Sequence, residues 1–386
     1  MTLSEPYCYG AKSMLRNSRR LILLLLAAVA LGYLFYKFRN SIALEGFRWS
    51  MVGQSLHQAR VSLLLLAIVA VYGCFAIRAL RWMRFSRTLG QTHFWNVYPA
   101  TLMGFSCTFL LGRAAEPIRP VLIAKKDSLS VPHMFGVYVL ERVFDMAATA
   151  VLAGTALLFF ERHGIVGGQN DAVMKVARSA GVALLIGLIV VISFLIHFRY
   201  HGAEWLGRRL RNTSWRSGWR GKIVVLLEGF SEGLQGIRTW NDLAVLIGLS
   251  IVHWALVVLC YQLVFNSFGG ALGKFSFASA ALVLAFSMVG SAAQLPGVGG
   301  GAQLATFLVL TLIFGVEKVP AATASIIVWL VTFASCSLVG LPLLFREGWS
   351  MGELRKMASE AEHDAETVAE RAALGGAAAR PGEKLL

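Results

Sequence analysis

One stretch of the chain, residues 113–145, combines arginines, carboxylates and prolines between two apolar segments. Ionisable side chains at membrane depth are costly unless they are paired, so they are rare there and usually functional. The forked donors of arginine match a phosphate group, whereas a carboxylate pairs with arginine or with a cationic headgroup. The stretch therefore predicts a lipid headgroup site formed by Arg113, Glu116, Arg119, Glu141, Arg142 and Asp145.

The spacing of these residues leaves two interpretations open. Glu141 and Asp145 are four residues apart and share one helix face, with Arg142 about 100° away from it. In the first interpretation, the carboxylates bind Arg113 and Arg119 in a salt-bridge network that only fixes the packing of two helices. In the second, the arginines take a lipid phosphate, and the carboxylates hold those arginines while the site is empty.

The composition is that of a polytopic membrane protein. Hydrophobic residues make up 56% of the chain and charged residues 15%, whereas a soluble domain is roughly half apolar and a quarter charged. The net charge of +15 is attributed to cytoplasmic loops and anionic lipid headgroups, so no nucleic acid is expected as a partner. The sequence has no P-loop, no catalytic motif and no metal-ligand spacing, so neither a cofactor nor an enzymatic activity is expected.

Six apolar segments are predicted to span the membrane: 21–36, 61–77, 134–160, 176–198, 243–265 and 321–345. Two further segments are interrupted. The first joins 96–111 to the charged stretch, where Pro117 and Pro120 are expected to break any helix. The second covers 275–315 and is broken by prolines and glycines, with its candidate residues at Pro296, Gly297, Gly300 and Gln303.

Loop charges predict how these segments are oriented. Residues 78–95 sum to +4 and residues 199–222 to +6, whereas 161–175 sum to zero. Because basic loops stay in the cytoplasm, each interrupted unit must return to the side from which it enters. The predicted fold is thus an all-α polytopic membrane protein with about six full spans and two interrupted or re-entrant hairpins in opposite, inverted-repeat-like orientation. Such hairpins typically mark a transport site near the membrane midplane.

Two other regions have candidate roles. The glycines at the second break permit a tight turn whose free amides face a substrate or a neighbouring helix. The basic and aromatic region 199–240 suits a membrane interface, and its second part, 223–237, has an amphipathic helix face. Specific lipid contact and a purely topogenic loop both stay open for its Arg208, Arg209, Arg211, Trp215 and Trp219.

The domain organisation follows from these patterns. A basic cytoplasmic N-terminus is expected over 1–20, a transmembrane domain over 21–345 and a flexible cytoplasmic tail over 346–386. The tail has no apolar stripe wide enough to be buried in a core.

Three motifs in order resemble the lysylphosphatidylglycerol synthase transmembrane-region family, a flippase-like membrane domain, over about residues 15–345. An R-x-x-E-x-x-R-P motif and an E-R-x-x-D motif lie in the charged stretch, and a P-G-G-x-G-x-x-E type break comes late. They are matched by Arg113, Glu116, Arg119 and Pro120; by Glu141, Arg142 and Asp145; and by Pro296, Gly297 and Gly300. Gln303 stands where this family usually has glutamate, which removes a charge from the second hairpin.

The resemblance implies transport or related handling of phospholipids or lipid-linked intermediates in the inner membrane of a prokaryote, with both termini cytoplasmic. The soluble aminoacyl-transferase domain of full-length synthases is not expected, because only about 40 residues follow the last span. Two alternatives remain: a membrane-embedded transferase acting on a lipid carrier, and a non-transporting partner subunit of an envelope complex.

The loop charges generate the first prediction. Both termini and residues 199–240 should lie in the cytoplasm, and residues 161–175 outside. Single Gly167→Cys and Ser217→Cys variants in a cysteine-free background test this arrangement. An impermeant thiol reagent added outside should label the variant at position 167 and leave the one at 217 unmodified. Equal labelling of both would contradict the topology.

Overall fold

The computed structural model describes residues 49–112, 115–162, 239–291, 294–295 and 299–348, together with positions 182, 186, 189, 190 and 193. The chain divides into two compact units, Met1–Gly53 and Gln54–Leu386. In the first unit, the described residues are the start of helix α2 (Trp49–Gln58). All further description concerns the second unit.

The described part of the second unit is helical apart from one short strand pair. Its helices are α3 (Val61–Phe85), α4 (Phe94–Leu111), α5 (Ile118–Lys126), α6 (Val131–Arg162), α9 (Trp240–Ser267), α10 (Phe277–Gly290), α11 (Gly301–Leu312), α12 (Lys318–Trp329) and α13 (Ser337–Arg346), with a 3₁₀ turn at Leu272–Lys274. Within the described ranges, three helical segments are long and apolar enough to cross a membrane: Val61–Phe85, Trp240–Ser267 and Lys318–Arg346. An all-α membrane protein is thereby shown, and the number and orientation of its spans stay predictions.

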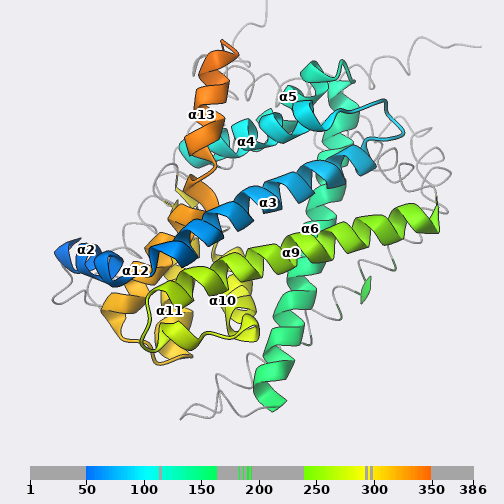
Figure 1. The fold of residues 1–386 in the computed structure, drawn as a ribbon. Coiled ribbons are helices and arrows are strands. Elements are labelled where there is room, and N and C mark those ends of the chain that lie inside the picture. Colours follow the sequence, from blue (N-terminus) through cyan, green and yellow to red (C-terminus); the bar gives the residue numbers. More distant parts are fainter. Residues whose placement is uncertain are drawn as a thin grey trace, which may run out of the picture. The chain divides into compact units, whose positions relative to one another are not determined.

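Helices α3 and α9 lie side by side and run antiparallel (Figure 1). At one end the Arg60 amide donates to the Ser267 carbonyl at 2.9 Å, and at the other Arg81 Nη1 donates to Ser250 Oγ at 3.3 Å. Helix α6 contacts both of them. This three-helix arrangement brings polar residues from distant parts of the sequence close together.

The first interrupted unit is a hairpin of α4 and the shorter α5 (Figure 1). The chain turns after α4 at Gly112, whose φ of +79° is accessible to glycine. The expectation that both prolines break the helix is only partly correct. Pro117 precedes α5, but Pro120 lies inside its first turn. Proline is tolerated there because first-turn amides have no intrahelical acceptor.

The second interrupted unit is a hairpin of α10 and α11 around a two-residue antiparallel pair, β1 (Gln294–Leu295) and β2 (Gly299–Gly300). The backbone turns into α11 at Gly300, where φ is +123°. The Gly300 amide donates to the Gln303 side-chain oxygen. Glutamine and glutamate both serve in this capping position, so the family's usual glutamate is not required for the cap.

The last predicted span, 321–345, is one continuous helical segment with a local irregularity. Helices α12 and α13 are joined by a π-helical segment, Leu330–Ala334. The Tyr72 hydroxyl of α3 donates to the carbonyl of Ser335 just beyond it, at 2.8 Å. This bond ties the irregular part of the span to α3.

Several sequence predictions fall outside the described residues. These are the N-terminus 1–20, the span 21–36, residues 163–175 of the outside loop, most of the span 176–198, the loop 199–238 and the tail from 349 onward. The candidate residues that also fall outside the described part of the chain are Arg113, Pro296, Gly297, Arg208, Arg209, Arg211, Trp215 and Trp219.

The contact between α13 and α4 depends on a glycine. A Cβ at Gly340 would lie 2.8 Å from the Leu102 carbonyl carbon and would overlap the Ser106 hydroxyl. Gly340→Ala should therefore lower the free energy of unfolding by about 1–3 kcal/mol, as overpacking does. Gly248→Ala in α9 is the matched control, because a Cβ there meets nothing within 4 Å. Thermal unfolding in detergent measures both variants, and equal melting temperatures would contradict the packing.

Candidate functional site

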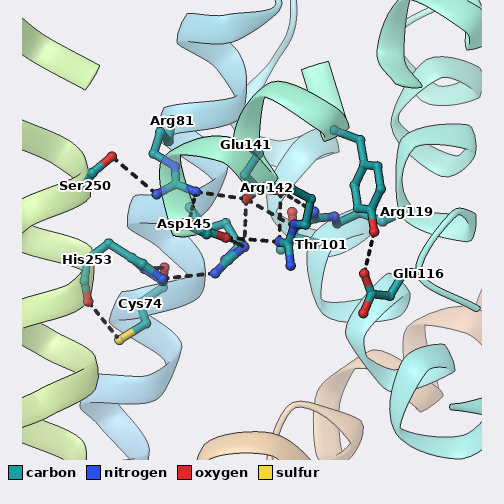
Figure 2. A network of polar contacts seen from close by, with 12 residues as sticks. Cys74, Arg81, Thr101, Glu116, Arg119, Glu141, Arg142, Asp145, Ser250 and His253 are labelled. Atoms are coloured by element: carbon teal, nitrogen blue, oxygen red, sulfur yellow. Dashed lines mark hydrogen bonds and ion pairs between the residues drawn. The ribbon is translucent and has the colours of Figure 1, made fainter. Parts of the chain in front are cut away.

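Two carboxylates on α6 are surrounded by arginines from three helices (Figure 2). Glu141 Oε1 accepts from Arg78 Nη1 at 2.7 Å, and Asp145 Oδ1 accepts from Arg81 Nη2 at 2.6 Å. Glu141 Oε2 also accepts from Arg119 Nη2 of α5. Glu141 and Arg81 are fully buried, and the other three are at most 8% exposed. A buried network of this kind links α3, α5 and α6 directly.

Arg142 joins the same network from within α6. Its Nη2 lies 3.3 Å from Glu141 Oε2 and 3.1 Å from Asp145 Oδ2. The helical spacing places its Cβ away from the acidic face, but its long side chain returns to both carboxylates. Its side chain is still 35% exposed. Arg142 is therefore a more accessible member of an otherwise buried group.

The structure corrects the prediction for Arg78 and Arg81. The predicted second span ends at residue 77, which places both arginines in a cytoplasmic loop, whereas α3 continues to Phe85. The burial of Trp82 and Phe85, each 0% exposed, continues the apolar face past the first arginine. That face is the signal in the sequence that indicates a longer helix.

Helix α9 contributes two polar side chains that the sequence analysis also missed. Ser250 accepts from Arg81, and His253 Nε2 lies 3.0 Å from Arg78 Nη2. His253 Nδ1 lies 3.2 Å from the Cys74 carbonyl. Because a carbonyl only accepts, the ring proton belongs on Nδ1, which leaves Nε2 as the acceptor for the arginine. His253 thus extends the network to a fourth helix.

Aromatic rings enclose the Arg119 guanidinium. Its Cζ lies 4.7 Å from the ring centroid of Trp82, 5.2 Å from that of Phe105 and 5.8 Å from that of Tyr138. Such cation–π contacts hold a guanidinium in place where water is excluded. The Tyr138 hydroxyl in turn donates to the Glu116 carboxylate (Figure 2). Glu116 therefore lies beside the network and not among its central carboxylates.

A cavity of about 230 Å³ adjoins the network. Charged side chains of its lining come from α3, the α5 region and α6. Its uncharged lining residues come from α3 and α6 as well, and from α4, α9, α10, α11, α12 and the π-helical segment. The cavity thus lies between the two interrupted hairpins. Its charged lining consists of Arg78, Glu116, Arg119, Arg142 and Asp145; among the described lining residues, Arg81 and Glu141 are not found.

The network has more positive than negative charge. Among the residues that the structure describes, four arginines face two central carboxylates, which leaves a formal excess of +2, or +1 when Glu116 is included. Unbalanced charge in a low-dielectric interior is unfavourable unless another group compensates it. A singly negative group in the cavity would compensate the +1 that remains once Glu116 is counted, and arginine is well suited to phosphate.

The structure thus brings five of the six predicted headgroup residues to one cavity or network: Glu116, Arg119, Glu141, Arg142 and Asp145. Arg113 is outside the described residues. Of the second break, Gly300 and Gln303 are described, and their hydrogen bond caps α11.

Comparison with known proteins identifies the class. The chain matches a family model whose description is lysylphosphatidylglycerol synthase TM region. The match covers residues 20–340. The chain belongs to this family, as its motifs predicted, and is a lipid-related membrane protein. Searches of curated proteins and of solved structures found no match.

The differing burial of the arginines predicts two kinds of variant. Arg81→Met should lower the free energy of unfolding by about 3–5 kcal/mol, because it breaks the buried ion pairs that Arg81 makes with Asp145 and Glu141. Arg142→Met removes a partly exposed pairing and should cost at most about 1 kcal/mol. Melting temperatures of the two ligand-free variants in detergent measure this difference. Equal losses would show that both arginines have the same structural role.

Proposed function

We propose that the protein transports a lipid with an anionic headgroup across the membrane and binds that headgroup at the arginine–carboxylate network. The observation that carries the proposal is the excess of arginine beside a cavity between two interrupted hairpins. The family supports a role with membrane lipids. We place the protein in the cytoplasmic membrane of a prokaryote, with both termini in the cytoplasm.

Binding begins at the most accessible arginine. The side chain of Arg142 is 35% exposed, compared with 9% for Arg78 and 4% for Arg119. A lipid phosphate pairs with Arg142 first and then with the two arginines deeper in the cavity. Each new contact replaces part of an existing contact to Glu141 or Asp145.

Release reverses this exchange. When the phosphate leaves, the carboxylates bind the arginines again, so no guanidinium stays unpaired in a low dielectric. The free-energy difference between the loaded and empty states is therefore small compared with the cost of burying free charges. That balance suits a carrier, which has to bind a headgroup and also release it.

The hairpins supply the parts that move. Both end in glycine-containing turns, at Gly112 and Gly300, and both contribute residues to the cavity wall. A tilt of one hairpin relative to the α3–α9 pair would open the cavity toward one membrane face and close it toward the other. Motion of one repeat against another around a fixed site is typical of transporters with interrupted helices.

The test is lipid exchange by the purified protein in proteoliposomes, followed with fluorescently labelled phosphatidylglycerol and phosphatidylcholine. The wild-type protein should exchange phosphatidylglycerol faster than protein-free vesicles do. Arg119→Ala should slow this exchange about 10- to 100-fold, because a hydrogen bond to a charged group contributes about 1.5–3 kcal/mol. Arg87→Ala is the control, since its side chain is 67% exposed.

Two results would contradict the proposal. Exchange no faster than in protein-free vesicles would contradict the proposed transport activity and favour a lipid-carrier transferase or a partner subunit. Normal exchange by a folded Arg119→Ala protein would remove the network as the headgroup site while leaving transport itself in place.

A further inference from the structure

We infer that the uncharged part of the cavity binds a neutral polyhydroxyl group, such as a glycerol or a cyclic polyol, that is linked to the phosphate of the transported lipid. The inference rests on the proposed function and specifies the chemical class of the headgroup.

The cavity extends away from the arginines along the α3–α9 pair. On α9 its lining runs from His253, beside Arg78, to Tyr261. Eight residues at about 1.5 Å per residue correspond to roughly 12 Å along the helix axis. A phosphate bound at the arginines therefore leaves room beyond it for the group that it esterifies.

Two buried donors in the wall of the cavity have no partner. The indole nitrogen of Trp254 and the hydroxyl of Thr306 are without a hydrogen bond in the described structure, and the two residues are 4% and 1% exposed. Both line the cavity. A buried donor left unsatisfied costs about 1–3 kcal/mol, so these positions favour a ligand with hydroxyl oxygens.

The Thr306 hydroxyl differs from those of other helical threonines around the cavity. Thr108 Oγ1 donates to the Gly104 carbonyl at 3.0 Å, and Thr332 Oγ1 donates to the Val328 carbonyl at 2.6 Å. These two hydroxyls are satisfied within their own helices. Thr306 is not, although it also lies in a helix, so its donor is available to a ligand.

The remaining lining suits a polyol. The Tyr261 hydroxyl lies 3.0 Å from Ser287 Oγ, which provides further donors and acceptors at the same end. The rings of Trp329 and Phe333 also line the cavity and offer apolar faces to the C–H groups of a polyol. Hydroxyls paired with polar atoms and C–H groups packed on rings together recognise a neutral sugar-like group.

The same lining disfavours a cationic headgroup. The acidic residues among the described lining are Glu116 and Asp145. Glu116 accepts from Tyr138, and Asp145 is bound by arginines. An aminoacylated headgroup would place its ammonium beside an excess of arginine with no carboxylate left to receive it. The charges therefore favour a singly negative phosphodiester that carries an uncharged group.

Binding of three dioleoyl lipids to the purified full-length protein tests the inference by native mass spectrometry. Phosphatidylethanol has a singly charged phosphodiester without hydroxyls, phosphatidylglycerol adds a glycerol, and phosphatidylinositol adds a cyclic polyol. At least one polyol lipid should bind about tenfold more tightly than phosphatidylethanol. Thr306→Val and Trp254→Phe should each reduce that preference several-fold and leave phosphatidylethanol binding unchanged.

Matched variants separate the hydroxyl from the fold. Thr306→Ser keeps the donor and should keep the preference. Thr332→Val removes a hydroxyl that is already satisfied within its helix, so it should also keep the preference. The melting temperature of each ligand-free variant shows whether it is folded, and a Thr306→Val protein that fails to fold leaves Trp254→Phe to decide.

The outcomes distinguish this inference from the proposed function. Equal binding of all three lipids by the wild type, or tighter binding of lysyl-phosphatidylglycerol than of phosphatidylglycerol, would overturn the polyol inference. Unchanged preference in both Thr306→Val and Trp254→Phe would overturn it as well. In each case, loss of all lipid binding in Arg119→Ala would still support the proposed anionic headgroup site. Normal binding by Arg119→Ala would instead overturn the site on which the inference depends.

Discussion

The pairing of Glu141 and Asp145 with four arginines is the interaction on which the rest of the site depends. Arg78 and Arg81 can be buried in α3 because these carboxylates lie opposite them, and Arg119 fixes α5 against α6 in the same way. A buried ion pair adds little net stability compared with apolar packing, but breaking it leaves a charge without compensation. The network therefore determines the relative positions of α3, α5 and α6 while leaving a positive excess at the cavity.

The elements of this fold could largely be predicted from apolar runs and breaks, whereas the pairing could not. The core of each described span lies within a predicted run, because about 20 apolar residues are required to cross a bilayer. Arg78 and Arg81 follow such a run, and the charge rule for loops assigns arginines in this position to the cytoplasm. Their true partners are on α6, more than 50 residues further along the chain. Local hydropathy contains no information on a contact at that separation.

Local chemistry corrected the expectation for Pro120 at the first break and gave Gln303 a role at the second. Pro120 is compatible with α5 because it lies in the first turn, and Gln303 caps α11 through an oxygen that glutamate would also provide. At these two helix ends, the position of a residue within the first turn therefore predicts the local structure better than its residue type does. The charged cluster around Arg119 and Glu141 was predictable from residue type, since such residues are rare in an apolar segment unless they are paired there.

The two halves of the site differ in chemistry. The charged lining comes from α3, the α5 region and α6, whereas α9 to α12 supply His253 together with aromatic, hydroxyl and aliphatic side chains. A bound phosphate compensates the arginine excess only at the first half, so a ligand with one charged and one neutral part can enter in a single orientation. Inversion of that ligand would place its phosphate at the Tyr261 end of the cavity, where the described lining has no arginine to replace the water around a full charge. Under the proposed function, the direction in which the headgroup lies is thus determined by the protein, whichever hairpin moves during transport.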